Sequence, residues 1–210
     1  KYHYIGFRHL LTKGNIMDFD LLFEEFPKRI IPYDYDAYAK NSGRYEMVTT
    51  NCTTGCAEYF EEKSDPERII DIVRASSSLP FVTPISYVDG RPMLDGGIAD
   101  SIPVVRATEQ GFDNCLVVLT RNAGYRKSAK PSFVPWFAYR RYPMLQEAIR
   151  HRNAEYNKQM ELVERLESEG RITVIRPERP IEVGRMERDT HRLLALYNEG
   201  YDLASKVEIG

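Results

Sequence analysis

The sequence predicts an α/β fold: a mostly parallel, doubly wound sheet covered by helices, with a C-terminal helical extension. Residues 115–120 and 172–175 form continuous apolar runs of strand length. Strands of a parallel sheet that is covered on both faces read as such runs rather than as alternating patterns. Helical patterns joined to these runs by short connections are typical of a doubly wound sheet.

The composition is that of an ordinary globular protein. The 210 residues, 42% of them hydrophobic and 29% charged, are enough for one large domain or for a domain with a small appendage. The net charge of −2 gives no indication of a nucleic-acid partner. No apolar run reaches the roughly 18 residues of a membrane span. Three cysteines, an odd count, argue against a disulfide framework and favour a reducing, cytoplasmic location.

The N-terminal segment is aromatic and mixed. Asp18 or Asp20 is expected to cap a helix over residues 21–26 that ends before Pro27, and residues 33–45 are expected to form a surface loop. A further helix-like fragment is indicated by the apolar residues Tyr2, Ile5, Phe7, Leu10 and Leu11.

A first hairpin is predicted from residues 45–51, which have the β-branched character of a strand, and residues 57–60, which follow Thr53-Thr54-Gly55. Cys52 and Cys56 flank this turn. Without a nearby histidine or a second cysteine pair they are a poor zinc signal, and we expect both to be small packing residues.

A second hairpin ends in the most informative stretch of the chain. Residues 83–88 are β-rich, Asp89-Gly90 is a strong turn signal, and residues 91–94 return. Asp95 follows directly, so a carboxylate is expected where the sheet ends. Gly96-Gly97 then allows the backbone to turn and another chain to approach closely.

Capping residues and the helical spacing of apolar residues predict four further helices. Asp65-Pro66-Glu67 opens one in the N-cap style, and another runs from residue 102 to about 110. A long helix is predicted over residues 144–169, ended by Gly170, and a last one over residues 185–206.

Residues 121–141 form a long loop that is basic, aromatic and free of acidic side chains. Such a loop at the carboxyl end of a strand could contact a lipid head group or an anionic membrane surface, through Arg121, Arg126 and Lys127. The alternative is an ordinary loop whose aromatics pack inward and whose charges are solvated. The charged and aromatic residues are Arg121, Tyr125, Arg126, Lys127, Lys130, Phe133, Trp136, Phe137, Tyr139, Arg140 and Arg141.

Several of these features occur together in one known family. The run Ala75-Ser76-Ser77-Ser78-Leu79-Pro80-Phe81, then Pro84, then Leu94-Asp95-Gly96-Gly97-Ile98-Ala99-Asp100-Ser101-Ile102-Pro103-Val104 resembles the second half of a patatin-like phospholipase domain. The segment around Thr53-Thr54-Gly55 is similar to the family's Ala-Thr-Asp-x-x-Thr-Gly segment. The run Leu196-Tyr197-Asn198-Glu199-Gly200-Tyr201 resembles the C-terminal extension of bacterial members.

The resemblance implies a serine acyl hydrolase that acts on a lipid or small ester, without a metal or cofactor. Asp95 would be the base of a Ser-Asp dyad. A carboxylate of ordinary pKa, about 4, is a weak base at neutral pH, so partial burial would have to raise its pKa. Residues Ser76, Ser77, Ser78 and Leu79 would form a cleft wall facing Asp95, with Gly96 and Gly97 beside it. Alternatively, the serine hydroxyls only satisfy a helix terminus.

The nucleophile of the dyad is missing from this sequence. No serine has glycine at both the −2 and +2 positions, the pattern of the sharp nucleophile turn. The chain begins at Lys1, and we expect it to be the C-terminal part of a longer protein. Residues 1–141 would complete a patatin-like domain together with its missing N-terminal part, and residues 142–210 would be an extension packed on it.

Two other interpretations stay open. The chain could be a noncatalytic binding or scaffolding module that meets a partner or a membrane through the basic aromatic loop. Asp95 and Asp100 could also be metal ligands, although no further clustered acids or histidines support them.

Overall fold

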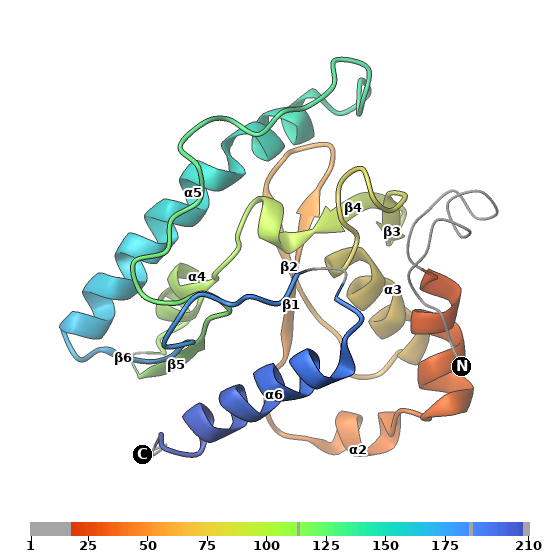
Figure 1. Cartoon of the computed structure of the whole chain (residues 1–210). Helices are drawn as coiled ribbons and strands as arrows, with labels where there is room; N and C mark the ends of the chain where they lie inside the picture. Colours follow the sequence, from red (N-terminus) through yellow and green to blue (C-terminus); the bar gives the residue numbers. More distant parts are fainter. Residues whose placement is uncertain (1–17, 113, 185–186, 208–210) are drawn as a thin grey trace. The chain divides into compact units, whose positions relative to one another are not determined.

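The computed structural model describes residues 18–112, 114–184 and 187–207 (Figure 1). In these residues it shows a mixed α/β protein with a four-stranded and a two-stranded sheet. The chain forms two compact units. The first runs to Ser101 and resumes over Lys130–Glu155, and the second comprises Ile102–Ala129 and the chain from Tyr156 onward. The predicted helix-like fragment within residues 2–11 lies outside the described residues.

The sheet of the first unit is antiparallel and has the strand order β2-β1-β4-β3. Both predicted hairpins are confirmed, and Asp89 and Gly90 have φ values of 51° and 74°, as a two-residue hairpin turn requires. The prediction of a mostly parallel sheet is wrong here, because a tight turn can only join antiparallel neighbours. The four strands are β1 (Glu46–Asn51), β2 (Ala57–Glu61), β3 (Ser86–Val88) and β4 (Arg91–Asp95).

Helix α3 (Pro66–Ser76) covers this sheet and begins as predicted. The Asp65 side chain accepts hydrogen bonds from the backbone N–H groups of Glu67 and Arg68, at 3.0 and 3.2 Å. Its apolar face is buried against the sheet in a core made of Met47, Phe60, Ile72, Ala75, Val88 and Met93.

The segment before the sheet differs from the prediction. The π-helix η1 (Leu21–Ile30) continues through Pro27 instead of ending before it. Its last turn is closed by bonds of longer span than an α-helix uses, such as that from the Ile31 N–H to the Phe26 carbonyl at 2.9 Å. The expected loop contains a short helix, α2 (Tyr35–Lys40), because the Asp34 side chain caps the Ala37 N–H at 2.8 Å.

The sheet of the second unit is the predicted parallel pair of β5 (Cys115–Val118) and β6 (Ile172–Ile175). The prediction that these strands are buried on both faces is wrong. Leu116 and Val118 are 40% and 68% exposed, and the alternate side chains of β5 are only half-buried. Helix α4 (Val104–Glu109) precedes β5.

The long helix α5 (Pro143–Ser168) confirms the prediction within one residue at each end. Gly170 ends it with a φ of 69°, and the Arg171 N–H donates to the Leu166 carbonyl at 2.9 Å, which satisfies the last turn. Its residues to Glu155 belong to the first unit and the rest to the second. Across the described ranges, no helix combines the length and apolar character that a membrane span requires.

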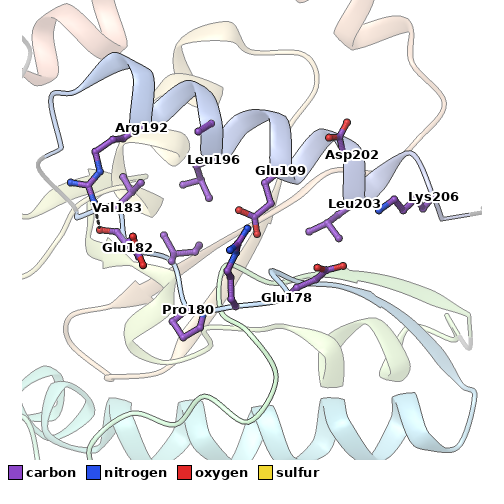
Figure 2. Close-up of a pocket in the computed structure, with 13 residues that line it drawn as sticks. Glu178, Pro180, Glu182, Val183, Arg192, Leu196, Glu199, Asp202, Leu203 and Lys206 are labelled. Carbon is purple, nitrogen blue, oxygen red and sulfur yellow. Dashed lines mark hydrogen bonds between the residues drawn. The ribbon is translucent and has the colours of Figure 1, made fainter.

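Helix α6 (Thr190–Ala204) packs loosely within the second unit. It faces residues 178–183 across a pocket of about 550 Å³, into which Leu196, Glu199 and Leu203 point (Figure 2). None of its residues is buried, and Tyr197 and Tyr201, both 66% exposed, stack on its outer side.

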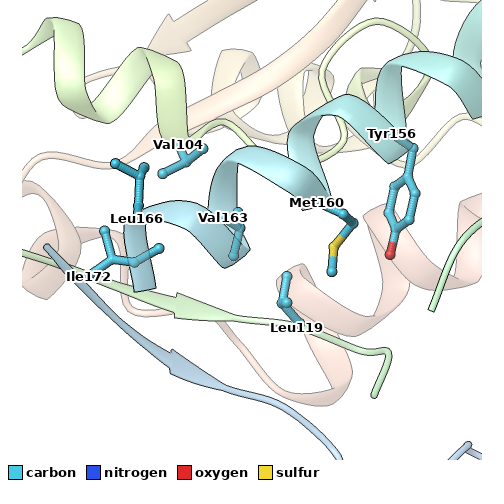
Figure 3. Close-up of a cluster of buried hydrophobic side chains, with 7 residues drawn as sticks. All are labelled: Val104, Leu119, Tyr156, Met160, Val163, Leu166 and Ile172. Atoms are coloured by element: carbon cyan, nitrogen blue, oxygen red, sulfur yellow. The ribbon is translucent and has the colours of Figure 1, made fainter. Parts of the chain in front are cut away.

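Among its described residues, the second unit has a hydrophobic core between α5 and the parallel strands (Figure 3). Met160 and Val163 of α5 are fully buried in it. The complete cluster consists of Val104, Leu119, Tyr156, Met160, Val163, Leu166 and Ile172.

Candidate functional site

Asp95 is the last residue of β4, and hydrogen bonds hold it on three sides. Its N–H donates to the Ser78 carbonyl at 2.8 Å, and its own carbonyl accepts from the Thr50 hydroxyl at 2.9 Å. Its carboxylate Oδ1 accepts from the Gly97 N–H at 2.7 Å. The main chain and the carboxylate are therefore fixed together, and the side chain is half-buried.

Gly96 and Gly97 have different roles in the turn after Asp95. A Cβ atom on Gly96 would lie 2.4 Å from the Val48 carbonyl oxygen, so the close approach of β1 requires glycine there. At Gly97 the nearest atom to such a Cβ would be Asp95 Oδ1, at 3.1 Å. Glycine therefore keeps the space beside the carboxylate open.

The structure brings the predicted cleft wall, residues 76–79, to Asp95 through the Ser78 carbonyl. Ser76 Oγ donates to the Val48 carbonyl at 2.7 Å, and Ser78 Oγ donates to the Arg74 carbonyl at 2.8 Å. Ser77 is exposed at the end of α3, and Leu79 is half-buried. The Ser78 hydroxyl thus satisfies a carbonyl of the last turn of α3, as the helix-terminus interpretation expects, whereas the Ser76 hydroxyl bonds to strand β1.

Asp100 follows the glycine turn, and its carboxylate is hydrogen-bonded to strand β2. The Tyr59 hydroxyl donates to its Oδ2 at 2.6 Å. Within residues 18–112, 114–184 and 187–207, no group of three or more histidine, cysteine or acidic side chains could hold a metal ion.

The three basic residues predicted to contact head groups interact with side chains of their own unit. Arg126 forms a two-point ion pair with Glu164, at 2.5 and 3.0 Å. Lys127 lies over the Tyr156 ring at 3.8 Å, and Arg121 lies over the Tyr125 ring.

Two residues of the site were missed by the sequence analysis. Thr50 is fully buried, and its hydroxyl also accepts the Ala99 N–H at 3.2 Å, so it ties β1 to the turn after Asp95. The Tyr139 hydroxyl accepts the Phe81 N–H at 2.9 Å, just after the cleft wall. Neither pairing has a local sequence signal, because each joins segments more than 40 residues apart.

The three cysteines are free thiols and differ in burial. Cys52 is fully buried, and burial raises the pKa of its thiol to about 12. Cys56 is exposed, so the prediction of a packing role is wrong for it, because the turn carries it out of the sheet. Cys115 is half-buried against the core of the second unit.

The histidines contribute no catalytic arrangement among the described residues. His151 is a surface residue with Nε2 at 2.8 Å from a Glu147 oxygen, and His191 is exposed on α6. His3 and His9 lie outside the described residues.

Comparison with known proteins supports the resemblance and adds a second region. Residues 3–108, half of the chain, match the profile of the family described as Patatin-like phospholipase. Residues 142–207 match a domain of unknown function (DUF6363). The chain is 27% identical over 174 residues to the uncharacterized protein YjjU of Escherichia coli strain K12, an alignment that covers 80% of this chain and 48% of that protein. The chain thus spans about half the length of this curated relative.

Proposed function

The chain belongs to the patatin-like phospholipase family, and from that premise we propose that it carries the base of a lipid acyl hydrolase. In this proposal Asp95 is the general base of a Ser-Asp dyad, and the nucleophilic serine lies in a segment outside residues 1–210. The observation that carries the proposal is the three-sided fixation of Asp95 at the end of β4.

The proposed reaction uses Asp95 twice. The carboxylate takes the proton of the serine hydroxyl as its oxygen attacks the ester carbonyl, and the proton then passes to the leaving alcohol. A water molecule, deprotonated by the same carboxylate, hydrolyses the acyl-enzyme. Because a base must lie within hydrogen-bond reach of the proton it takes, the rigid placement of Asp95 favours this role.

The division of the chain is part of the proposal. Residues 1–141 would belong to the patatin-like domain and residues 142–210 to an extension. The two separate profile matches, over residues 3–108 and 142–207, support this division. In the structure, helix α5 contributes to both compact units, so the extension would not fold independently of the domain.

The test is the substitution Asp95→Asn in a protein that carries the complete patatin-like domain. We expect hydrolysis of a short nitrophenyl ester to fall roughly 10²–10⁴-fold, the loss typical of removing a general base, at an unchanged melting temperature. Asp100→Asn is the matched control, since that acid lies in the same turn but pairs with Tyr59, and it should keep activity within a few-fold. Equal activity of Asp95→Asn and the control would refute the base role.

A further inference from the structure

Three large aromatic side chains are displayed to solvent within a short stretch of the first unit. Phe133, Trp136 and Phe137 are 84%, 73% and 63% exposed. They belong to residues 130–141, here called the aromatic loop, which contain no helix or strand. Single exposed apolar side chains are common on protein surfaces, but three lie here within five residues, and Trp136 and Phe137 pack edge to face with ring centroids 5.9 Å apart, as is typical of an interaction site.

The aromatic loop is held from beneath while its aromatic side chains point outward. Val134 is buried in a core with Leu145 and Ile149, so the loop has an apolar anchor. The Ser132 N–H donates to the Arg150 carbonyl at 3.0 Å, and the Gln146 side chain donates to the Ala138 carbonyl at 2.6 Å. The exposure of the three rings is therefore a property of a fixed backbone.

The charge of this region has one sign. No aspartate or glutamate occurs between Asp113 and Glu147 in the sequence. Lys130, Arg140 and Arg141 are exposed on the aromatic loop, and the Arg140 guanidinium lies over the Trp136 ring at 5.4 Å. Basic side chains beside exposed aromatic rings complement a surface that is anionic outside and apolar beneath.

The aromatic loop is joined directly to the candidate site. Tyr139 accepts the Phe81 N–H, and the two rings pack with centroids 5.3 Å apart. Phe81 follows the cleft wall, whose Ser78 carbonyl accepts the Asp95 N–H. Phe81 is itself 51% exposed. A surface that engages the aromatic loop would therefore lie beside the wall that supports Asp95.

We propose that the aromatic loop docks the protein on an anionic lipid bilayer, with Phe133, Trp136 and Phe137 entering the interface and Lys130, Arg140 and Arg141 contacting lipid head groups. This inference rests on the proposed function, since it supplies a lipid hydrolase with its substrate surface. It moves the membrane contact from Arg121, Arg126 and Lys127, which interact within their own unit, to the second half of the loop.

A bilayer fits these observations better than a nucleic acid. The whole chain has a net charge of −2, so it lacks the extended positive field that nucleic-acid binding uses. Three exposed rings on one loop can also insert into an apolar interior, where each buried ring strengthens binding by roughly 10-fold.

Trp136 is the only tryptophan in the chain, so its fluorescence reports on this loop alone. We expect vesicles of phosphatidylcholine with phosphatidylserine to shift its emission to the blue, and brominated lipids to quench it. Vesicles of phosphatidylcholine alone should have a much weaker effect, and salt should weaken the response.

Variants test the two components separately by vesicle sedimentation. Phe133→Ser with Phe137→Ser should weaken binding to both kinds of vesicle, whereas the matched control Phe112→Ser, an exposed ring elsewhere, should not. Arg140→Gln with Arg141→Gln should weaken binding to the anionic vesicles by roughly 5-fold per charge. The control pair Arg171→Gln with Arg179→Gln, both exposed, should leave binding unchanged.

Unchanged Trp136 emission with anionic vesicles would overturn the proposal. An equal loss of vesicle binding in the control variants would also overturn it. A blue shift that depends on protein concentration without lipid would assign the rings to a protein contact and also overturn it. Because no hydrolysis is measured, failure here is separate from failure of Asp95 as a base, which the ester assay detects.

Discussion

Strands β4 and β5 differ in how far their apolar side chains are covered. In β4, Met93 and Leu94 are fully buried, and Asp95 after them is fixed by hydrogen bonds from β1, the Ser78 segment and the glycine turn. In β5, Leu116 and Val118 are open to solvent. The candidate base is therefore positioned by hydrogen bonds around a strand end, one within the glycine turn and two from segments distant in sequence, and not by the apolar character of the strand.

The largest expected effect is the difference in stability between substituting a buried and an exposed apolar side chain of the second unit. Met160→Ala should destabilise the protein by about 2–5 kcal/mol, because it leaves a cavity in the core of Figure 3. Val118→Ala should change the free energy of unfolding by no more than about 0.5 kcal/mol, since that side chain is 68% exposed. Urea denaturation measures both. A large loss in Val118→Ala would mean that this face is covered in solution.

Alanine substitutions at two glycines test how closely β1 approaches the turn after Asp95. Gly96→Ala should cost about 1–3 kcal/mol, because its Cβ would meet the backbone of Val48, which cannot rotate away. Gly184→Ala is the control, because nothing lies within 4 Å of a Cβ at that position. Thermal unfolding of the two variants should differ clearly. Equal melting temperatures of the two variants would contradict the close approach of β1 to the turn after Asp95.

The smallest expected effect concerns acid stability. The Ser64 N–H and hydroxyl and the Arg68 guanidinium hydrogen-bond the Glu62 carboxylate and lower its pKa to about 2. Since its folded pKa lies below the ordinary value of 4.5, this stabilisation is complete above that value and is lost as the pH falls toward about 2. Glu62→Gln should cost about 1 kcal/mol at neutral pH and flatten the pH dependence of urea denaturation in this window. An unchanged slope would contradict the assignment.

The sequence predicts the features that depend on interactions between residues close together in the chain. Asp89-Gly90 predicted the second hairpin, Asp65 predicted the start of α3, and Gly170 predicted the end of α5. Asp95 was singled out by its place between a strand and two glycines. These features depend on residues within a few positions of one another, so single-chain patterns report them.

The features that the sequence did not predict depend on distant partners. The apolar run of residues 115–120 looked like a strand covered on both faces, and nothing local indicates that one face is open. The role of Thr50 arises because β1 pairs with β4, about 45 residues away. The exposure of Phe133, Trp136 and Phe137 could not be distinguished from inward packing, because Val134 and Tyr139 in the same loop do pack inward.

The most direct test of the central claim uses a serine-reactive fluorophosphonate probe, followed by mass spectrometry of the labelled peptides. If Asp95 is the base of a dyad whose serine lies outside this chain, residues 1–210 alone should remain unlabelled and should not hydrolyse esters. In a protein with the complete domain, the probe should label a serine outside this chain, and Asp95→Asn should suppress the labelling. Stoichiometric labelling of Ser77 in residues 1–210, together with ester turnover, would refute the proposed division of the dyad and place the whole active site within this chain.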